Sequence, residues 1–205
     1  MKKVSLFLFL ACMLPLGCSS PSGKENSQGA QQQEPSQLET GRIALQKMIP
    51  PARFWAPDAQ PVQVNSEVLK DSNGHDGKSG FWRATFASTG RQKAETFTWS
   101  GMSGSDTPRG VDHGAQDSFD PSNRSTRPFE LSYLKIDSDK AFAVAQEHGG
   151  KKLLAKDPKA GVKYVLDWDP QASQLKWHVY YSGNDPSAKL AVVVNASSGE
   201  FLHKE

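Results

Sequence analysis

The stretch Ile136–Leu202 constrains the fold of this 205-residue chain more than any other. It opens with a helix signal, in which Asp137 or Ser138 can cap the N-terminus and Gly149-Gly150 can end the helix. Three strand signals follow, at Val162–Asp169, Leu175–Ser182 and Ala188–Asn195. The first two alternate apolar and polar residues, and the third is apolar on both faces, as in a central strand. This order predicts a short helix packed on an antiparallel sheet.

A weaker copy of the same order precedes this stretch, between Gly41 and Gly101. Thr40 is a possible N-cap for its helix, and Pro50-Pro51 predict a break or kink within it. One irregular strand and a hairpin follow, and Trp82 falls where Trp177 falls in the later copy. The sequence therefore predicts an α+β fold of two tandem α-β-β-β units, residues 40–101 and 129–205. The alternative is two unrelated stretches that share common hairpin patterns.

Aromatic residues on the predicted strands have two interpretations. Trp82 and Trp177 lie in phase with apolar neighbours, so we expect both in the core. Tyr180 is out of phase with Trp177 and is the better candidate for an exposed contact. Together with Trp99 on another strand, it is a candidate binding residue on a sheet face that takes a peptide or a glycan.

Residues 102–128 are polar and rich in Gly and Pro, which predicts a long loop between the two units. Loops of that length are either linkers or functional segments. The acidic residues of this loop and His113 lack the regular spacing of a calcium-binding loop. We therefore predict no metal site, but the loop remains a candidate site for a ligand or for hydrolysis.

The N-terminus carries a targeting signal. Met1-Lys2-Lys3 is a basic start, and the apolar run Val4–Leu16 is too short to cross a bilayer as a stable helix. Leu14-Pro15-Leu16-Gly17-Cys18 then resembles a bacterial lipobox, in which the signal peptide 1–17 is removed and Cys18 is lipidated. An ordinary secretory signal is the alternative. Ser19 after the cysteine resembles lipoproteins sorted to the outer membrane, facing the periplasm.

The mature chain is predicted to begin with a disordered tether, residues 18–39, because this stretch is polar and almost free of apolar residues. About twenty such residues reach roughly 25 Å. Loss of Lys2 and Lys3 reduces the 24 basic residues to 22, which equals the 22 acidic residues. A neutral chain lacks the basic excess of a nucleic-acid-binding protein, so no nucleic-acid partner is expected. With Cys18 lipidated and Cys12 removed, no thiol is left for catalysis or a disulfide.

The C-terminal unit resembles the PepSY domain. The residues that carry the resemblance are Ala141 and Ala145 in the helix, Trp177-His178-Val179 in a strand, and the closing run Asn195–Glu200. The resemblance covers about 65 residues well and the Gly41–Gly101 unit faintly. It implies small α+β units of PepSY/cystatin-like type, often found in secreted or membrane-anchored bacterial proteins. Since some PepSY domains precede metallopeptidases as inhibitory segments, it also implies peptidase regulation.

No zinc-peptidase, P-loop, dinucleotide-binding or Gly-x-Ser-x-Gly pattern occurs in the sequence. We therefore predict no catalytic residues and no cofactor. The predicted function is that of a non-enzymatic, lipid-anchored envelope protein, attached to the membrane through Cys18, that binds a protein or peptide. The alternative is an envelope ligand-binding protein or hydrolase that uses the loop 102–128. The sequence does not indicate the oligomeric state.

Overall fold

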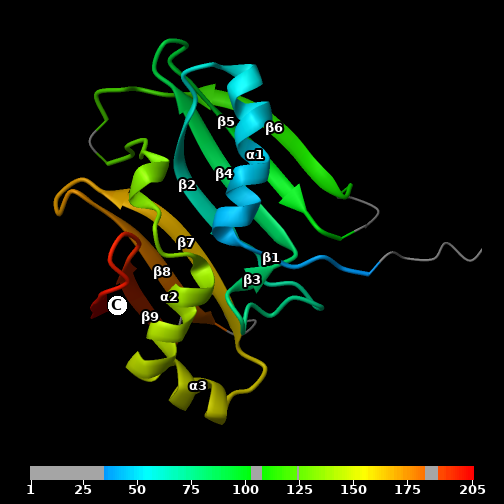
Figure 1. Cartoon of the computed structure of the whole chain (residues 1–205), viewed down its shortest axis with the longest axis vertical. Coiled ribbons are helices and arrows are strands. Elements are labelled where there is room, and N and C mark those ends of the chain that lie inside the picture. Colours follow the sequence, from blue (N-terminus) through cyan, green and yellow to red (C-terminus); the bar gives the residue numbers. More distant parts are fainter. Residues whose placement is uncertain (1–34, 103–107, 124, 183–188) are drawn as a thin grey trace, which may run out of the picture. The chain divides into compact units, whose positions relative to one another are not determined.

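The computed structural model describes residues 35–102, 108–123, 125–182 and 189–205. The predicted signal peptide, Cys18 and residues 18–34 of the predicted tether lie outside the described residues. The chain is α+β, with helices on an antiparallel sheet (Figure 1). The helical elements are α1 (Gly41–Trp55), η1 (Leu131–Tyr133), α2 (Ser138–Ala145), η2 (Gln146–Gly150) and α3 (Lys151–Lys156). The strands are β1 (Glu39–Thr40), β2 (Gln60–Ser66), β3 (Lys78–Ser79), β4 (Phe81–Ser88), β5 (Lys93–Ser100), β6 (Gly110–Ser118), β7 (Gly161–Asp169), β8 (Gln174–Ser182), β9 (Leu190–Asn195) and β10 (Phe201–Lys204).

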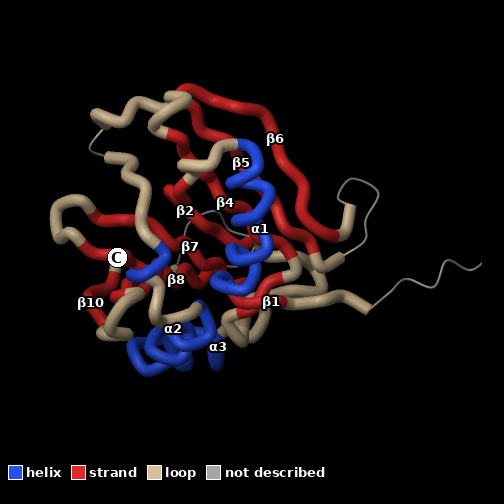
Figure 2. The backbone as a smooth tube through the Cα atoms, turned by 45° about the horizontal axis from the view of Figure 1, so that its top comes forward, coloured by secondary structure: helices blue, strands red, loops and turns tan. Residues whose placement is uncertain are grey.

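Eight strands form one sheet in the order β10-β9-β8-β7-β2-β4-β5-β6, and β1 pairs with β3 in a separate two-stranded sheet. The first half of the chain supplies β2, β4, β5 and β6, and the second half supplies β7 to β10. The halves meet at the centre, where β2 pairs with β7. Helix α1 packs on β4 and β5, while α2 packs on β8 and β9. Figure 2 shows β6 and β10 at the two edges of this sheet. Among the described residues, no helix is long and apolar enough to span a membrane.

The core lies between the helices and the inner face of the sheet. The expected alternation is confirmed in β4, where Trp82, Ala84 and Phe86 are all buried. Trp177 is also fully buried, and its ring meets Trp82 edge-on at 6.4 Å between centroids. Among the described residues, helices α1 and α2 lie on the inner face (Figure 1), and the outer face is more polar apart from an apolar cluster of Val62, Ala87 and Phe119. Antiparallel sheets tolerate this arrangement because one face can remain solvated.

Two tryptophans hold the chain just ahead of the two main helices. The indole Nε1 of Trp82 donates a hydrogen bond to the carbonyl of Glu39 at 2.9 Å, one residue before the N-cap of α1. The indole Nε1 of Trp177 donates to the carbonyl of Ile136 at 2.8 Å, one residue before the N-cap of α2. Each half thus uses the same kind of bond from a buried strand to fix where its helix begins.

Asp137 joins the two helices. Its carboxylate accepts hydrogen bonds from the Thr40 hydroxyl at 2.6 Å, from the Arg42 backbone N–H at 2.9 Å and from the Ser138 backbone N–H at 2.7 Å. The Ser138 hydroxyl in turn accepts from the Gly41 backbone N–H at 2.9 Å. Side chains at the start of α2 therefore satisfy the backbone N–H groups of Gly41 and Arg42 at the start of α1, and the Asp137 carboxylate also satisfies the Ser138 N–H of α2.

The expected interruption at Pro50-Pro51 is wrong, because α1 runs through both prolines to Trp55. The two missing donors would have bonded the carbonyls of Gln46 and Lys47. Gln46 is exposed and Lys47 half-exposed, so water can reach their carbonyls. Ala52 in the last turn of α1 and Ala56 just after it are fully buried, so the end of the helix packs against the core.

The single helix predicted after Ile136 is in fact two helices, α2 and α3. Helix α2 ends at Ala145, and a kink with non-helical backbone at His148 and with Gly149 at a φ of 118° leads into a further helix, α3, that was not expected. The expected stop at the glycine pair is therefore a change of direction rather than an end. His148 at this turn stacks on Phe201 of β10 with ring centroids 3.7 Å apart.

The expected long loop 102–128 is also incorrect in part, because it contains the nine-residue strand β6. Glu95 of β5 is buried, accepts a hydrogen bond from Gln116 Nε2 of β6 at 2.9 Å, and lies 2.8 Å from His113 Nδ1 of the same strand. The polar sequence of β6 thus becomes a strand by pairing with β5 over a buried carboxylate. Asp106, considered above among possible cation ligands, lies outside the described residues.

We expect Asp137→Ala to lower the free energy of unfolding by about 2–4 kcal/mol, because it removes an N-cap and leaves buried donors from both helices unpaired. Urea unfolding followed by circular dichroism measures this loss. Glu147→Ala is the control, since Glu147 is exposed and such substitutions change stability by roughly 0.5 kcal/mol or less. Equal effects of the two substitutions would contradict the bridging role of Asp137.

Candidate functional site

The two halves are joined along a short seam. Strands β2 and β7 pair over three residue pairs, from Gln63–Asp167 to Asn65–Val165. Beyond Gln63, the chain from Phe119 to Phe129 (the crossing segment, described except for residue 124) passes this end of the seam. Phe119 packs on the outer face of the sheet with Val62 and Ala87, whereas Phe129 lies in the main core. The Phe129 N–H donates to the carbonyl of Pro61 at 2.9 Å. The segment therefore passes from one face of the sheet to the other.

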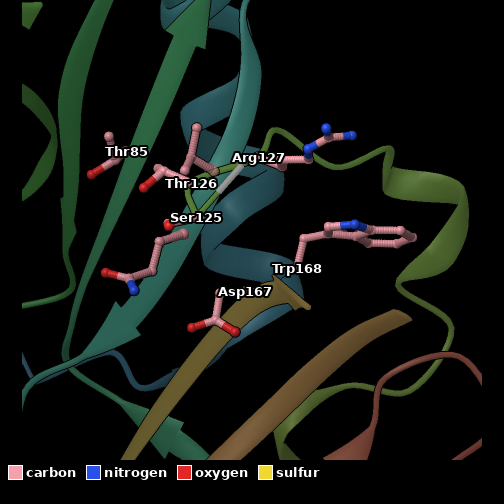
Figure 3. Close-up of a pocket in the computed structure, with 8 residues that line it drawn as sticks. Thr85, Ser125, Thr126, Arg127, Asp167 and Trp168 are labelled. Carbon is pink, nitrogen blue, oxygen red and sulfur yellow. The ribbon is translucent and has the colours of Figure 1, made fainter. Parts of the chain in front are cut away.

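A cavity of about 350 Å³ lies where the crossing segment meets the seam (Figure 3). Its walls come from both halves: Gln63 and Thr85 from β2 and β4, and Asp167 and Trp168 from β7. The crossing segment supplies the rest of the wall. Its three contributing residues are Ser125, Thr126 and Arg127.

Two further cavities continue from this one. The second, about 590 Å³, shares Ser125 and Arg127 with the first and extends along the turn after β7. The third, about 310 Å³, shares Val62, Thr85 and Thr126 and extends over β5 and β6. We call the three together the seam groove. It crosses five neighbouring strands, from β7 to β6, and is therefore roughly 20 Å long at about 4.8 Å between strands.

The groove carries charges of both signs. Arg127 is exposed and forms no ion pair with the described residues. Asp169, at the second cavity, is paired with Lys176, and the hydrogen bond from Lys176 holds the pKa of Asp169 below its usual value. Among the described residues that line the groove, Arg127 is therefore the cation that is available to a ligand.

Asp167 belongs both to the groove and to a cluster around His178 on the outer face. His178 Nε2 lies 3.3 Å from Asp167 Oδ1, and His178 Nδ1 lies 3.5 Å from Glu205 Oε1. Burial by itself lowers the pKa of His178, but the hydrogen bond and charge of Asp167 and the charge of Glu205 outweigh burial and raise it above 6.5, against the opposing charge of Lys176. Both ring nitrogens of His178 thus face carboxylates.

The two predicted binding residues lie outside the groove. Trp99 is only 3% exposed and lies beneath α1, where the Lys47 ammonium is 4.6 Å from its ring, so its expected place on an exposed face is wrong. Alternation places it with Phe97 on the inner face of β5. Tyr180 is half-buried on the outer face, and its ring is parallel to that of His178 at 6.0 Å. Burial raises the pKa of Tyr180, and the charges of Glu205 and Asp167 add to this.

Sequence reasoning missed Arg127, Asp167 and Trp168 as site residues. The polar, Gly/Pro-rich stretch 102–128 did point to the crossing segment. Nothing in the sequence showed that it would meet the end of β7, because that depends on the pairing of β2 with β7 about a hundred residues apart. The described residues contain no cluster of three or more His, Cys, Asp or Glu side chains arranged to hold a metal ion.

No protein-family model matches this chain, and no curated protein matches it either. One solved structure resembles it, that of a "putative lipoprotein" from Clostridium difficile 630. The TM-score is 0.52 at 12% sequence identity, and the match covers 79% of this chain and 91% of the other. At this identity the likeness concerns the fold alone.

His178 gives a pH dependence with a definite sign. Because its folded-state pKa is raised, its charge contributes stability that is fully present below about pH 6.5 and lost as the pH rises through the folded-state pKa. We expect the free energy of unfolding to fall more steeply between about pH 6 and pH 8 in the wild type than in His178→Gln. Urea unfolding at several pH values measures both slopes, and identical slopes would contradict this assignment.

Proposed function

We propose that this chain is a non-enzymatic, lipid-anchored cell-envelope protein that binds an extended polar ligand in the seam groove. The observation that carries the proposal is the continuity of the three cavities across five strands. A groove of roughly 20 Å suits a segment of a polymer better than a small compact molecule. Of the functions predicted from the sequence, this one favours the ligand-binding alternative that uses part of the loop 102–128.

The cluster beside the groove supports binding over catalysis. A histidine that acts as general base needs one ring nitrogen free to reach the substrate. His178 Nε2 instead lies 3.3 Å from Asp167 Oδ1, and Nδ1 is buried, makes no hydrogen bond and lies 3.5 Å from Glu205 Oε1. The Asp167–His178 pair thus resembles a catalytic dyad in composition but not in accessibility.

The anchor is proposed from the N-terminal sequence. Leu14–Cys18 resembles a lipobox, and the structural relative from Clostridium difficile is described as a lipoprotein, if only a putative one. Lipidated Cys18 followed by a polar tether would hold the folded part near the membrane. We place the protein at the outer membrane, facing the periplasm, on the strength of Ser19.

The resemblance to PepSY domains remains a hypothesis about ancestry. Each half has a helix followed by antiparallel strands, which fits two tandem units of that kind. A peptidase-modulating role would follow from the resemblance alone, whereas the seam groove gives the binding proposal a site of its own.

Cys18→Ala should move the full-length protein from the membrane fraction to the soluble fraction and abolish incorporation of labelled palmitate. A single acyl chain binds membranes weakly, so the several chains of a mature lipoprotein are what retain it. Cys12→Ala is the matched control and should leave both properties unchanged. If Cys18→Ala stays in the membrane fraction with its label, the lipid anchor lies elsewhere and this part of the proposal fails.

The groove is tested with two ligand panels, soluble envelope oligosaccharides and oligopeptides, by calorimetric titration of the soluble domain. Arg127→Ala should weaken binding of whichever panel binds by about tenfold, the effect of losing about 1.4 kcal/mol. Arg83→Ala is the control, because Arg83 is also an exposed arginine but lies outside the groove and pairs with Glu67. If neither panel binds, or if Arg83→Ala and Arg127→Ala have equal effects, the proposed function is wrong.

A further inference from the structure

We infer that the ligand of the seam groove is an oligosaccharide of the cell envelope rather than a peptide. This inference rests on the proposed function and concerns the chemical class of the ligand. Three independent properties of the groove carry it: the direction in which it runs, the side chains that line it, and the position of Trp168.

The groove runs across the strands and meets the edge strand β6 only at one end. Peptides that bind to sheets commonly add a strand at an edge, where backbone N–H and C=O groups are unpaired. The floor of the seam groove includes β2, β4 and β5, and each of these is hydrogen-bonded to a neighbour on both sides. A ligand there meets side chains only, so strand addition cannot supply its binding energy.

Neutral hydrogen-bonding side chains are the largest group in the lining, beside Arg127 and the four aspartates Asp117, Asp120, Asp167 and Asp169. Hydroxyl and amide groups act as both donors and acceptors, which matches a ligand covered with hydroxyl groups. They come from all parts of the groove: Gln63, Thr85, Thr96, Ser118, Asn123, Ser125 and Thr126. The larger apolar side chains of the third cavity, Val62 and Phe119, are buried against each other and against Ala87, and they leave no deep apolar pocket for a peptide side chain.

Trp168 provides an aromatic surface at the first cavity. It projects from the end of β7 below Arg127 (Figure 3), and both residues line the cavity. Tyr133 of η1 supports the indole, with ring centroids 5.1 Å apart at 60°. Sugar rings present C–H groups that pack on the electron-rich face of an indole. A half-buried, supported tryptophan amid hydroxyl groups therefore favours a sugar.

Arg127 and Asp167 add planar polar groups to the same cavity. A guanidinium presents paired donors and a carboxylate presents paired acceptors, so each can bridge two neighbouring hydroxyl groups of one sugar ring. Arg127 would also pair with a carboxylate on an acidic sugar. Among envelope polymers, these groups fit a glycan strand with hydroxyl, amide and carboxyl substituents.

The experiment measures the binding of the two panels to residues 35–205. The glycan panel consists of chitohexaose and glycan fragments released by a muramidase. The peptide panel consists of oligopeptides long enough to fill the groove, about six residues at ~3.3 Å each. We expect the glycans to bind and the peptides not to bind. Trp168→Ala should weaken glycan binding by about tenfold. Trp55→Ala, at an equally half-buried tryptophan near the C-terminal end of α1, should change it by less than about twofold.

Trp168→Phe guards against a folding defect, because it keeps an aromatic ring against Tyr133 and should retain most of the glycan affinity. Peptide binding that depends on Arg127, without glycan binding, would overturn the oligosaccharide inference and leave the groove as the binding site. Glycan binding that is unaffected by Trp168→Ala would also overturn it. Failure of both panels would remove the proposed function itself.

Discussion

The fold depends on one buried carboxylate. Asp137 caps α2 and at the same time accepts hydrogen bonds from Thr40 and Arg42 at the start of α1. This contact lies at the end of the seam where Ser66 of β2 meets Trp82 and Tyr164. The Asp137 contact joins the starts of α1 and α2 at this end of the seam. The crossing segment therefore covers the opposite end. The groove is thus a consequence of how the two halves are joined.

Much of this fold follows from local sequence signals. The alternation of Trp82, Ala84 and Phe86 predicts a strand with one buried face, and Asp137 ahead of a small-residue helix predicts its start, since both depend on neighbouring residues alone. The failures have a common cause. Strand β6 and the passage of α1 through Pro50 and Pro51 both rely on partners elsewhere in the chain, Glu95 in the first case and the sheet beneath Ala52 in the second. Tertiary packing overrode local propensity at these places.

The site was less predictable than the fold for the same reason. Asp167 and Trp168 are consecutive residues on β7. They lie beside Gln63 because β2 pairs with β7. They lie beside Arg127 because the crossing segment passes that end of the seam. Trp99 and Tyr180 were candidates because they are aromatic residues on strands. The alternation along each strand instead places Trp99 in the core and Tyr180 on the outer face, away from the groove. Trp168 lines the groove because it lies at the end of β7, a position that composition does not reveal.

The groove also explains why a likeness to a small single unit gives little information about function. One half supplies Gln63 and Thr85, the other supplies Asp167 and Trp168, and the connection between them supplies Ser125 to Arg127. Neither half alone holds more than one wall. Asp167 further ties the groove to His178 and the C-terminal Glu205, so a ligand that bonds Asp167 competes with the imidazole for the same carboxylate. Joining the two halves in one sheet therefore creates a groove, and a charge network behind it, that neither half possesses alone.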